Sequence, residues 1–167
     1  MLAAQRAQLG EDHPHTLVTR SNVASMYFVA GLLEQAEEEY RAVLDAERRL
    51  LGDADIEILV TNGNLACVLA ERGRYQQAEA EYRTVLAAET RVLGAEHPDT
   101  LTTRHNLGET LAAQGRRDDA LAELRTVLDA RRRVLGPQHP NTRQTESELS
   151  KLAPGLPSEP DDRGRQP

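Results

Sequence analysis

A period of 42 residues runs through most of this chain and constrains its fold more than any other feature. The dipeptide Leu-Gly recurs at residues 9, 51, 93 and 135, and a second glycine series falls at Gly31, Gly73 and Gly115. When residues 51–92 are aligned with residues 93–134, 20 of the 42 positions are identical. Repeats of this length are typical of solenoids and arrays, in which each unit packs only against its neighbours.

Apolar residues within each unit recur at helical spacing in two segments that a glycine separates. In the third unit, spacings of three, four and seven predict a first helix over about 98–114 and a second over about 117–135. Gly115 and Gly136 follow these segments, where a left-handed residue commonly ends a helix. Pro14, Pro98 and Pro140 open first helices, where the missing N–H costs nothing. The sequence therefore predicts an all-α array of helix pairs.

The spacing inside the unit favours one class of helix-pair repeat. Its marker residues in the third unit are Leu107, Gly108, Leu111, Gly115, Ala120 and Leu124. This pattern and the run LGAEHPDTLTTRHNLGETLAAQGR closely resemble the 42-residue tetratricopeptide repeat of kinesin light chains. The resemblance covers about residues 9–152 and implies a right-handed α-α superhelix, a tetratricopeptide (TPR) solenoid of three repeats. The second unit departs from it, since Asp55-Ile56 replaces His-Pro and leaves the start of its first helix less sharply set.

The repeat boundaries predict six segments. We expect residues 1–8 to be the remnant of a preceding repeat's second helix, 9–50, 51–92 and 93–134 to be three repeats, 135–152 a polar capping helix, and 153–167 a disordered tail. Because residues 2–10 resemble residues 86–94, we expect a fragment of a longer array or an array with a degenerate start. The basic residues are almost all Arg, with Lys151 as the one Lys, which fits a bacterial setting.

Composition argues against several function classes. The net charge of −7 gives no general attraction to phosphate backbones, so we expect no nucleic-acid partner. The longest apolar stretch, residues 65–70, is too short to span a bilayer, and the first residues lack the apolar core of a signal peptide, so we expect a cytoplasmic protein with no membrane partner. The dispersed glycines form no phosphate loop, and we expect no cofactor.

No set of residues suggests catalysis or metal binding. His13, His97 and His139 are each followed by Pro and lie a full repeat or more apart, so we expect capping or loop roles for them. Cys67 has no nearby His in the sequence, and we expect a groove-lining or partly buried thiol rather than a nucleophile. Arg20 and Arg104 are expected to pair with carboxylates of neighbouring helices. We therefore expect no enzyme.

The first helices are expected to line a concave groove. A helical wheel places one stripe of each first helix toward this groove. The tentative peptide-binding residues are Asn22, Asn64, Asn106, Thr19, Thr61, Thr103, Ser25 and Glu109, and the same stripes include Val18, Met26, Val29, Val60, Cys67 and Val68. An amide can both donate to and accept from a peptide backbone, and the resemblance implies that the recurring Asn contacts bound peptide. The alternative is that these Asn side chains hold the repeats together.

These expectations give one leading function and two alternatives. The leading hypothesis is a non-enzymatic module that binds a peptide or protein segment in its concave groove. The first alternative is a regulatory or sensor arm of a larger bacterial signalling ATPase, which would pack against other domains of its parent chain. The second alternative is a self-assembly module that acts through the helix at the N-terminal end. The sequence does not identify the partner.

Overall fold

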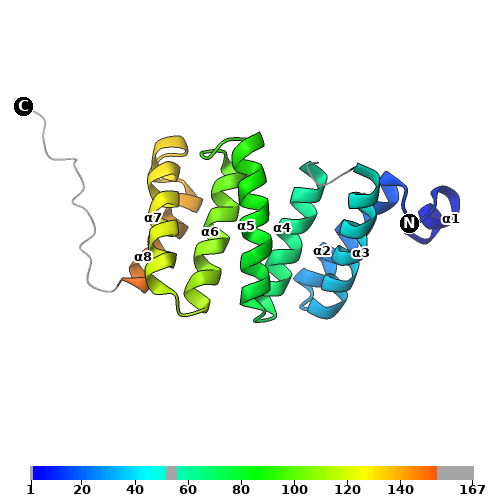
Figure 1. Ribbon diagram of the computed structural model, residues 1–167, viewed down its shortest axis with the longest axis horizontal. Coiled ribbons are helices and arrows are strands. Elements are labelled where there is room, and N and C mark those ends of the chain that lie inside the picture. Colours follow the sequence, from blue (N-terminus) through cyan, green and yellow to red (C-terminus); the bar gives the residue numbers. More distant parts are fainter. Residues whose placement is uncertain (1, 52–55, 154–167) are drawn as a thin grey trace, which may run out of the picture.

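The computed structural model describes residues 2–51 and 56–153, which form eight α-helices and no strand. The helices are α1 (Leu2–Leu9), α2 (Pro14–Val29), α3 (Leu33–Leu51), α4 (Ile56–Glu71), α5 (Tyr75–Val92), α6 (Pro98–Ala113), α7 (Arg117–Val134) and α8 (Pro140–Leu152). They lie side by side in an elongated row that follows the order of the chain (Figure 1). The expected effect of Asp55 and the expected tail beyond Ala153 lie outside the described residues.

The packing follows a nearest-neighbour scheme. Each helix packs against the helices before and after it in the chain. The first helices of successive pairs also contact one another, as α2 with α4, α4 with α6, and α6 with α8. Within the described ranges the second helices α3, α5 and α7 make no such contacts with one another. Because first helices lie closer together than second helices, the row curves with α2, α4, α6 and α8 on its concave face.

Small residues let the two helices of each pair approach closely. Ala24 and Ala66 are fully buried on the first helices of two pairs, and Gly108 takes the equivalent place on α6. A Cβ atom added to Gly108 would lie 2.8 Å from Cγ of Leu124 on α7, well inside normal contact distance. The third pair is therefore packed more closely at this point than an alanine would allow.

The helix ends confirm the capping and terminating residues that the sequence predicts. Gly31, Gly73 and Gly115 follow first helices with φ between +73° and +78°, the left-handed region that favours glycine. His97 caps α6, since its Nδ1 accepts a hydrogen bond from the backbone N–H of Asp99, and Pro98 takes the first turn. His13 and His139 cap α2 and α8 in the same way.

A cluster of ions joins the first and second helix pairs. The carboxylate of Glu37 on α3 is only 2% exposed, and it pairs with Arg41 on its own helix and with Arg72 and Arg74 around the turn between α4 and α5. Burial alone raises the pKa of Glu37, but the hydrogen bond from Arg74 and the charges of Arg41 and Arg72 hold it below its usual value.

The same cluster recurs one repeat later. Glu79 on α5 accepts hydrogen bonds from Gln114 Nε2 and Arg116 Nη1, both at 2.8 Å, and from Arg83 on its own helix. Burial raises the pKa of Glu79, and these donors outweigh that effect and lower it. Each cluster ties a second helix to the turn of the next pair, so both fix how neighbouring repeats stack.

Candidate functional site

Three cavities follow one another along the face formed by the first helices, and the recurring asparagines line all three. Asn22 and Asn64 line a cavity of about 260 Å³ between α2 and α4. Asn64 and Asn106 line the next, of about 170 Å³, between α4 and α6. Asn106 also lines the largest, of about 480 Å³, which extends toward the turn after α4. The three recurring asparagines of the predicted stripe therefore lie along a line of neighbouring hollows.

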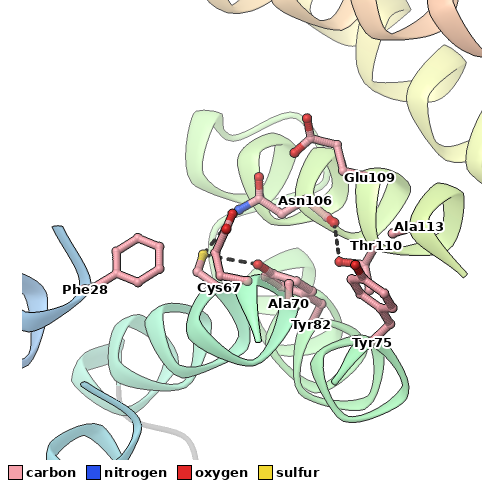
Figure 2. A pocket seen from close by; sticks show the side chains of 10 residues that line it. Phe28, Cys67, Ala70, Tyr75, Tyr82, Asn106, Glu109, Thr110 and Ala113 are labelled. Atoms are coloured by element: carbon pink, nitrogen blue, oxygen red, sulfur yellow. Dashed lines mark hydrogen bonds between the residues drawn. The ribbon is translucent and has the colours of Figure 1, made fainter. Parts of the chain in front are cut away.

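The largest cavity gathers aromatic, thiol and amide groups from four helices, α2, α4, α5 and α6 (Figure 2). The Tyr82 hydroxyl donates to the Cys67 sulfur at 3.1 Å, and Asn106 Nδ2 lies 3.8 Å from the same sulfur. Phe28 of α2 faces this group from the far side of the cavity. Burial raises the pKa of the Cys67 thiol and also that of Tyr82. The groove-lining, partly buried thiol that the sequence predicts is therefore found here.

Ser25 and Thr19 of α2 make local hydrogen bonds. The Ser25 hydroxyl lies 2.7 Å from the Tyr40 hydroxyl of α3 and lines the cavity between α2 and α4. Thr19 donates to the carbonyl of His15 one turn earlier. Thr19 is half-buried and lines none of the cavities described here. Ser25 thus lies at the groove, whereas the Thr19 hydroxyl makes a hydrogen bond to the backbone of its own helix.

The other predicted groove residues differ in their exposure. Thr61 and Thr103 are buried, and each lies in the wall of the cavity that separates its helix from a neighbour. Glu109 is exposed and lines the largest cavity, and the neighbouring His105, whose Nε2 lies 3.5 Å from Glu109 Oε1, lowers its pKa. Val68, which the helical wheel places on the groove stripe, is fully buried in the core. That expectation is wrong, because the stripe of α4 curves into the interface with its neighbours.

Apolar side chains complete the groove at its N-terminal end. Met26 is 70% exposed and Val29 is 87% exposed, and both line a shallow apolar hollow on α2. Val18 and Val60 are also exposed and line the cavity between α2 and α4. Large apolar groups exposed together on one face are commonly found where a partner binds.

The arginines expected to pair with carboxylates do so. Arg20 Nε donates to Glu39 Oε2 of α3 at 2.9 Å. Arg104 Nε lies 3.8 Å from Glu123 Oε2 of α7, at the equivalent register. These contacts link the two helices of one pair, so both arginines stabilise the scaffold.

The structure adds acidic residues that the sequence analysis does not place at the groove. Glu47 of α3 and Glu57 of α4 line the cavity between α2 and α4, and Glu89 of α5 and Asp99 of α6 line the next. Glu47 and Glu89 lie 42 residues apart, as do Glu57 and Asp99. The period itself is the signal that points to these positions, but only first helices are expected from the sequence to line the groove, and Glu47 and Glu89 lie on second helices.

Among residues 2–51 and 56–153, no group of three or more His, Cys, Asp or Glu residues is arranged to hold a metal ion. None of the helices described is both long and apolar enough to cross a membrane.

Comparisons with known proteins agree with this geometry. The tetratricopeptide repeat family model matches residues 16–89, 57–133 and 106–153. The chain belongs to the tetratricopeptide repeat family, whose members are generally modules for protein–protein interaction and typically act as scaffolds rather than catalysts. A comparison with curated proteins gives no significant match.

Solved structures show which form of the repeat the chain resembles. The crystal structure of nearly identical TPR-like repeats from a Podosopora anserina protein described as a kinesin light chain is 25% identical, with a TM-score of 0.77. It covers 90% of this chain, which spans 72% of that structure, and a point variant of the same repeats gives a TM-score of 0.78. BtubC (BKLC) from P. vanneervenii is 20% identical with a TM-score of 0.76, over 82% of this chain and 55% of its own. The repeats are therefore of the kinesin light chain type, as expected.

Proposed function

We propose that this chain is a non-enzymatic binding module that holds an extended peptide or protein segment in the concave groove formed by α2, α4 and α6. The observation that carries the proposal is the line of three cavities along this face, with Asn22, Asn64 and Asn106 at one-repeat intervals. An amide side chain can donate to a backbone carbonyl and accept from a backbone N–H. A ladder of three can therefore fix the register of a bound chain.

The apolar and aromatic side chains of the groove favour a bound segment that has both apolar and polar side chains. Met26, Val29 and Val60 offer exposed apolar contacts at one end. Phe28 and Tyr75 line the largest cavity, where aromatic side chains provide large contact areas. Apolar anchors with a few polar groups that fix orientation are the usual composition of binding sites.

The same groove gives no support to catalysis by its thiol. Nucleophilic cysteines need a lowered pKa, whereas burial raises that of Cys67, and its neighbours Glu71 and Glu109 raise it further. We therefore propose a binding module with no cofactor.

Replacing the amide ladder tests the proposal directly. The variant Asn22→Ala, Asn64→Ala, Asn106→Ala should fold and should bind a partner captured by the wild-type chain about tenfold more weakly or worse, because several polar contacts are lost together. The control replaces three exposed amides of the second helices, Gln35, Gln76 and Gln77, with Ala and should bind normally. Equal binding by both folded variants, measured by surface plasmon resonance, would rule out the groove ladder.

A further inference from the structure

We infer that the cavity between α4 and α6 is a subsite for a cationic side chain, an arginine of the bound segment, which Glu89 and Asp99 recognise. This inference rests on the proposed function, because it assigns a chemistry to one part of the same groove. It goes beyond that function in naming the class of segment bound, which is one rich in arginine.

The first observation is a buried carboxylate with an unused oxygen. Glu89 is only 7% exposed, and its Oε2 has no hydrogen-bond partner within the described part of the chain. Asp99 lies in the wall of the same cavity at the start of α6. None of the described residues that line this cavity is basic. Burying a carboxylate without a partner is costly, so such a group is retained where something external completes it.

The second observation comes from the equivalent place one repeat later. Position 89 corresponds to position 131, where the chain has Arg rather than Glu. The Arg131 side chain is only 2% exposed between α6, α7 and α8. Its Nη1 donates to the carbonyl of Asn141 at 3.1 Å and to the Thr145 hydroxyl at 2.7 Å, and its Nη2 to Thr102 at 3.4 Å. This junction therefore already contains a guanidinium that the chain itself provides.

Two of the three acceptors around Arg131 have counterparts in the cavity of Glu89. The Asn141 carbonyl corresponds to that of Asp99, and Thr145 corresponds to Thr103, whereas Val60 stands at the position of Thr102. Thr103 acts to lower the pKa of the Glu89 carboxylate. The cavity between α4 and α6 thus keeps part of the surroundings of the arginine at the next junction, with the Glu89 carboxylate in place of Arg131 and a second carboxylate, Asp99, in its wall. A guanidinium from a partner fits this place by charge and by hydrogen bonding.

The raised pKa of Glu89 agrees with a carboxylate that lacks a cationic partner. Burial raises the pKa of Glu89, and the charge of Asp99 raises it further, whereas Thr103 and His97 act to lower it. The alternative is that Glu89 serves only to complement the positive N-terminal end of α6, which would favour the ionised form. The net upward direction indicates that the surroundings of Glu89 do not by themselves stabilise its charge.

A second acidic cavity lies one repeat earlier and suggests the spacing of the cations. Glu47 and Glu57 line the cavity between α2 and α4 at the positions that correspond to Glu89 and Asp99. Helices in contact lie about 8–10 Å apart, so the two cavities are separated by about that distance. In an extended polyproline II chain, side chains three residues apart lie on one side, about 9 Å from each other. A segment with two arginines at this interval matches both cavities.

A labelled peptide with two arginines three residues apart in a Pro/Ala background tests the inference. Its control has citrulline at both places, which keeps the shape and removes the charge. We expect the arginine peptide to bind the wild-type chain at least tenfold more tightly than the citrulline peptide by fluorescence anisotropy at low salt. Glu89→Gln should remove most of that preference, and Asp99→Asn should remove a smaller part. Glu38→Gln, which neutralises an exposed carboxylate on α3, should leave it unchanged.

Two further measurements distinguish a loss of binding from a loss of folding. Glu89→Arg places an arginine as at the next junction and should abolish binding of the arginine peptide while the circular dichroism spectrum stays helical. Affinity of the wild-type chain should fall as pH decreases, because a protonated Glu89 no longer attracts a cation. Equal affinity for arginine and citrulline peptides, or no binding of the arginine peptide at millimolar concentration, would overturn the inference. The asparagine ladder would still be tested separately by its own variant.

Discussion

At the residue scale, two buried glutamates show how surroundings decide what a carboxylate does. Glu37 is surrounded by three arginines, which hold its pKa below the usual value. Glu89 is buried to a similar degree, but its surroundings raise its pKa and leave one oxygen without a partner among the described residues. The first carboxylate therefore stabilises the stack of repeats, and the second is the one for which we propose a ligand.

The role of Glu37 leads to a prediction about stability. Glu37→Gln should lower the free energy of unfolding by about 1–3 kcal/mol, because it leaves Arg72 and Arg74 beside a neutral group. The partly exposed arginines keep part of their hydration, which limits the loss. Glu38→Gln on the same helix is exposed and should change stability by less than about 0.5 kcal/mol. Urea unfolding of both variants measures this, and equal midpoints would contradict the assignment.

The two glutamates should also respond to pH in opposite directions. The pKa of Glu37 is lowered in the folded state, so its stabilising contribution is present at neutral pH and is lost as pH falls through that lowered pKa. The pKa of Glu89 is raised, so its contribution is fully present below the unfolded pKa and is lost as pH rises through the folded pKa.

Thermal unfolding from acidic to neutral pH can resolve this difference. Relative to the wild-type chain, Glu89→Gln should gain stability as pH increases, because the variant has no buried charge to form. Glu37→Gln should lose relative stability as pH increases over the acidic range. Parallel pH profiles for the two variants would show that burial and ion pairing do not distinguish these sites.

At the element scale, the distance between the helices of a pair depends on one small residue. Ala24 and Ala66 pack in the pairs whose second helix carries Tyr40 and Tyr82, whereas Gly108 packs against Leu124. The closer approach in the third pair leaves no room for a methyl group at Gly108. Size at this position is therefore matched to the facing side chain in each pair.

The close contact between Gly108 and Leu124 predicts that two Gly→Ala substitutions change stability in opposite directions. Gly108→Ala should lower stability by about 1 kcal/mol, because strain against Leu124 exceeds the gain in helix propensity. Gly63→Ala lies within α4, where an added Cβ meets nothing within 4 Å, and should raise stability by about 0.5–1 kcal/mol. Chemical denaturation compares the two. Stabilisation by both would show that α6 and α7 separate at little cost.

At the scale of the whole molecule, stability is distributed along a row of units that contact only their neighbours. α5 packs between α4 and α6, whereas within the described residues α1 packs against α2 alone. In such arrays the ends open first, because they have one interface fewer.

Hydrogen exchange measured by mass spectrometry should show this gradient. Backbone amides of α1 should exchange fastest among the helices and those of α5 should exchange slowly. We predict that α1 frays. Protection of α1 equal to that of α5 would contradict both the nearest-neighbour scheme and that expectation.

The repeat, the helix pairs and the ends of the helices can be predicted from the amino-acid sequence. The period, the glycines such as Gly31 and Gly115, and the His-Pro starts are local signals, and local signals follow directly from backbone preferences. They were enough to predict the tetratricopeptide fold and the stripe that contains Asn22, Asn64 and Asn106. Those predictions depend on contacts within a turn or a helix.

Which side chains face the hollows depends on how the repeats pack against one another. A helical wheel cannot tell that Val68 is buried or that Glu89 of a second helix reaches the groove, because both depend on how successive repeats are rotated and stacked. Arg131 reaches α8, and Glu37 reaches the turn after α4, through contacts between units. The packing of units against one another sets that stacking, and it therefore decides which parts of the groove are apolar, polar or acidic.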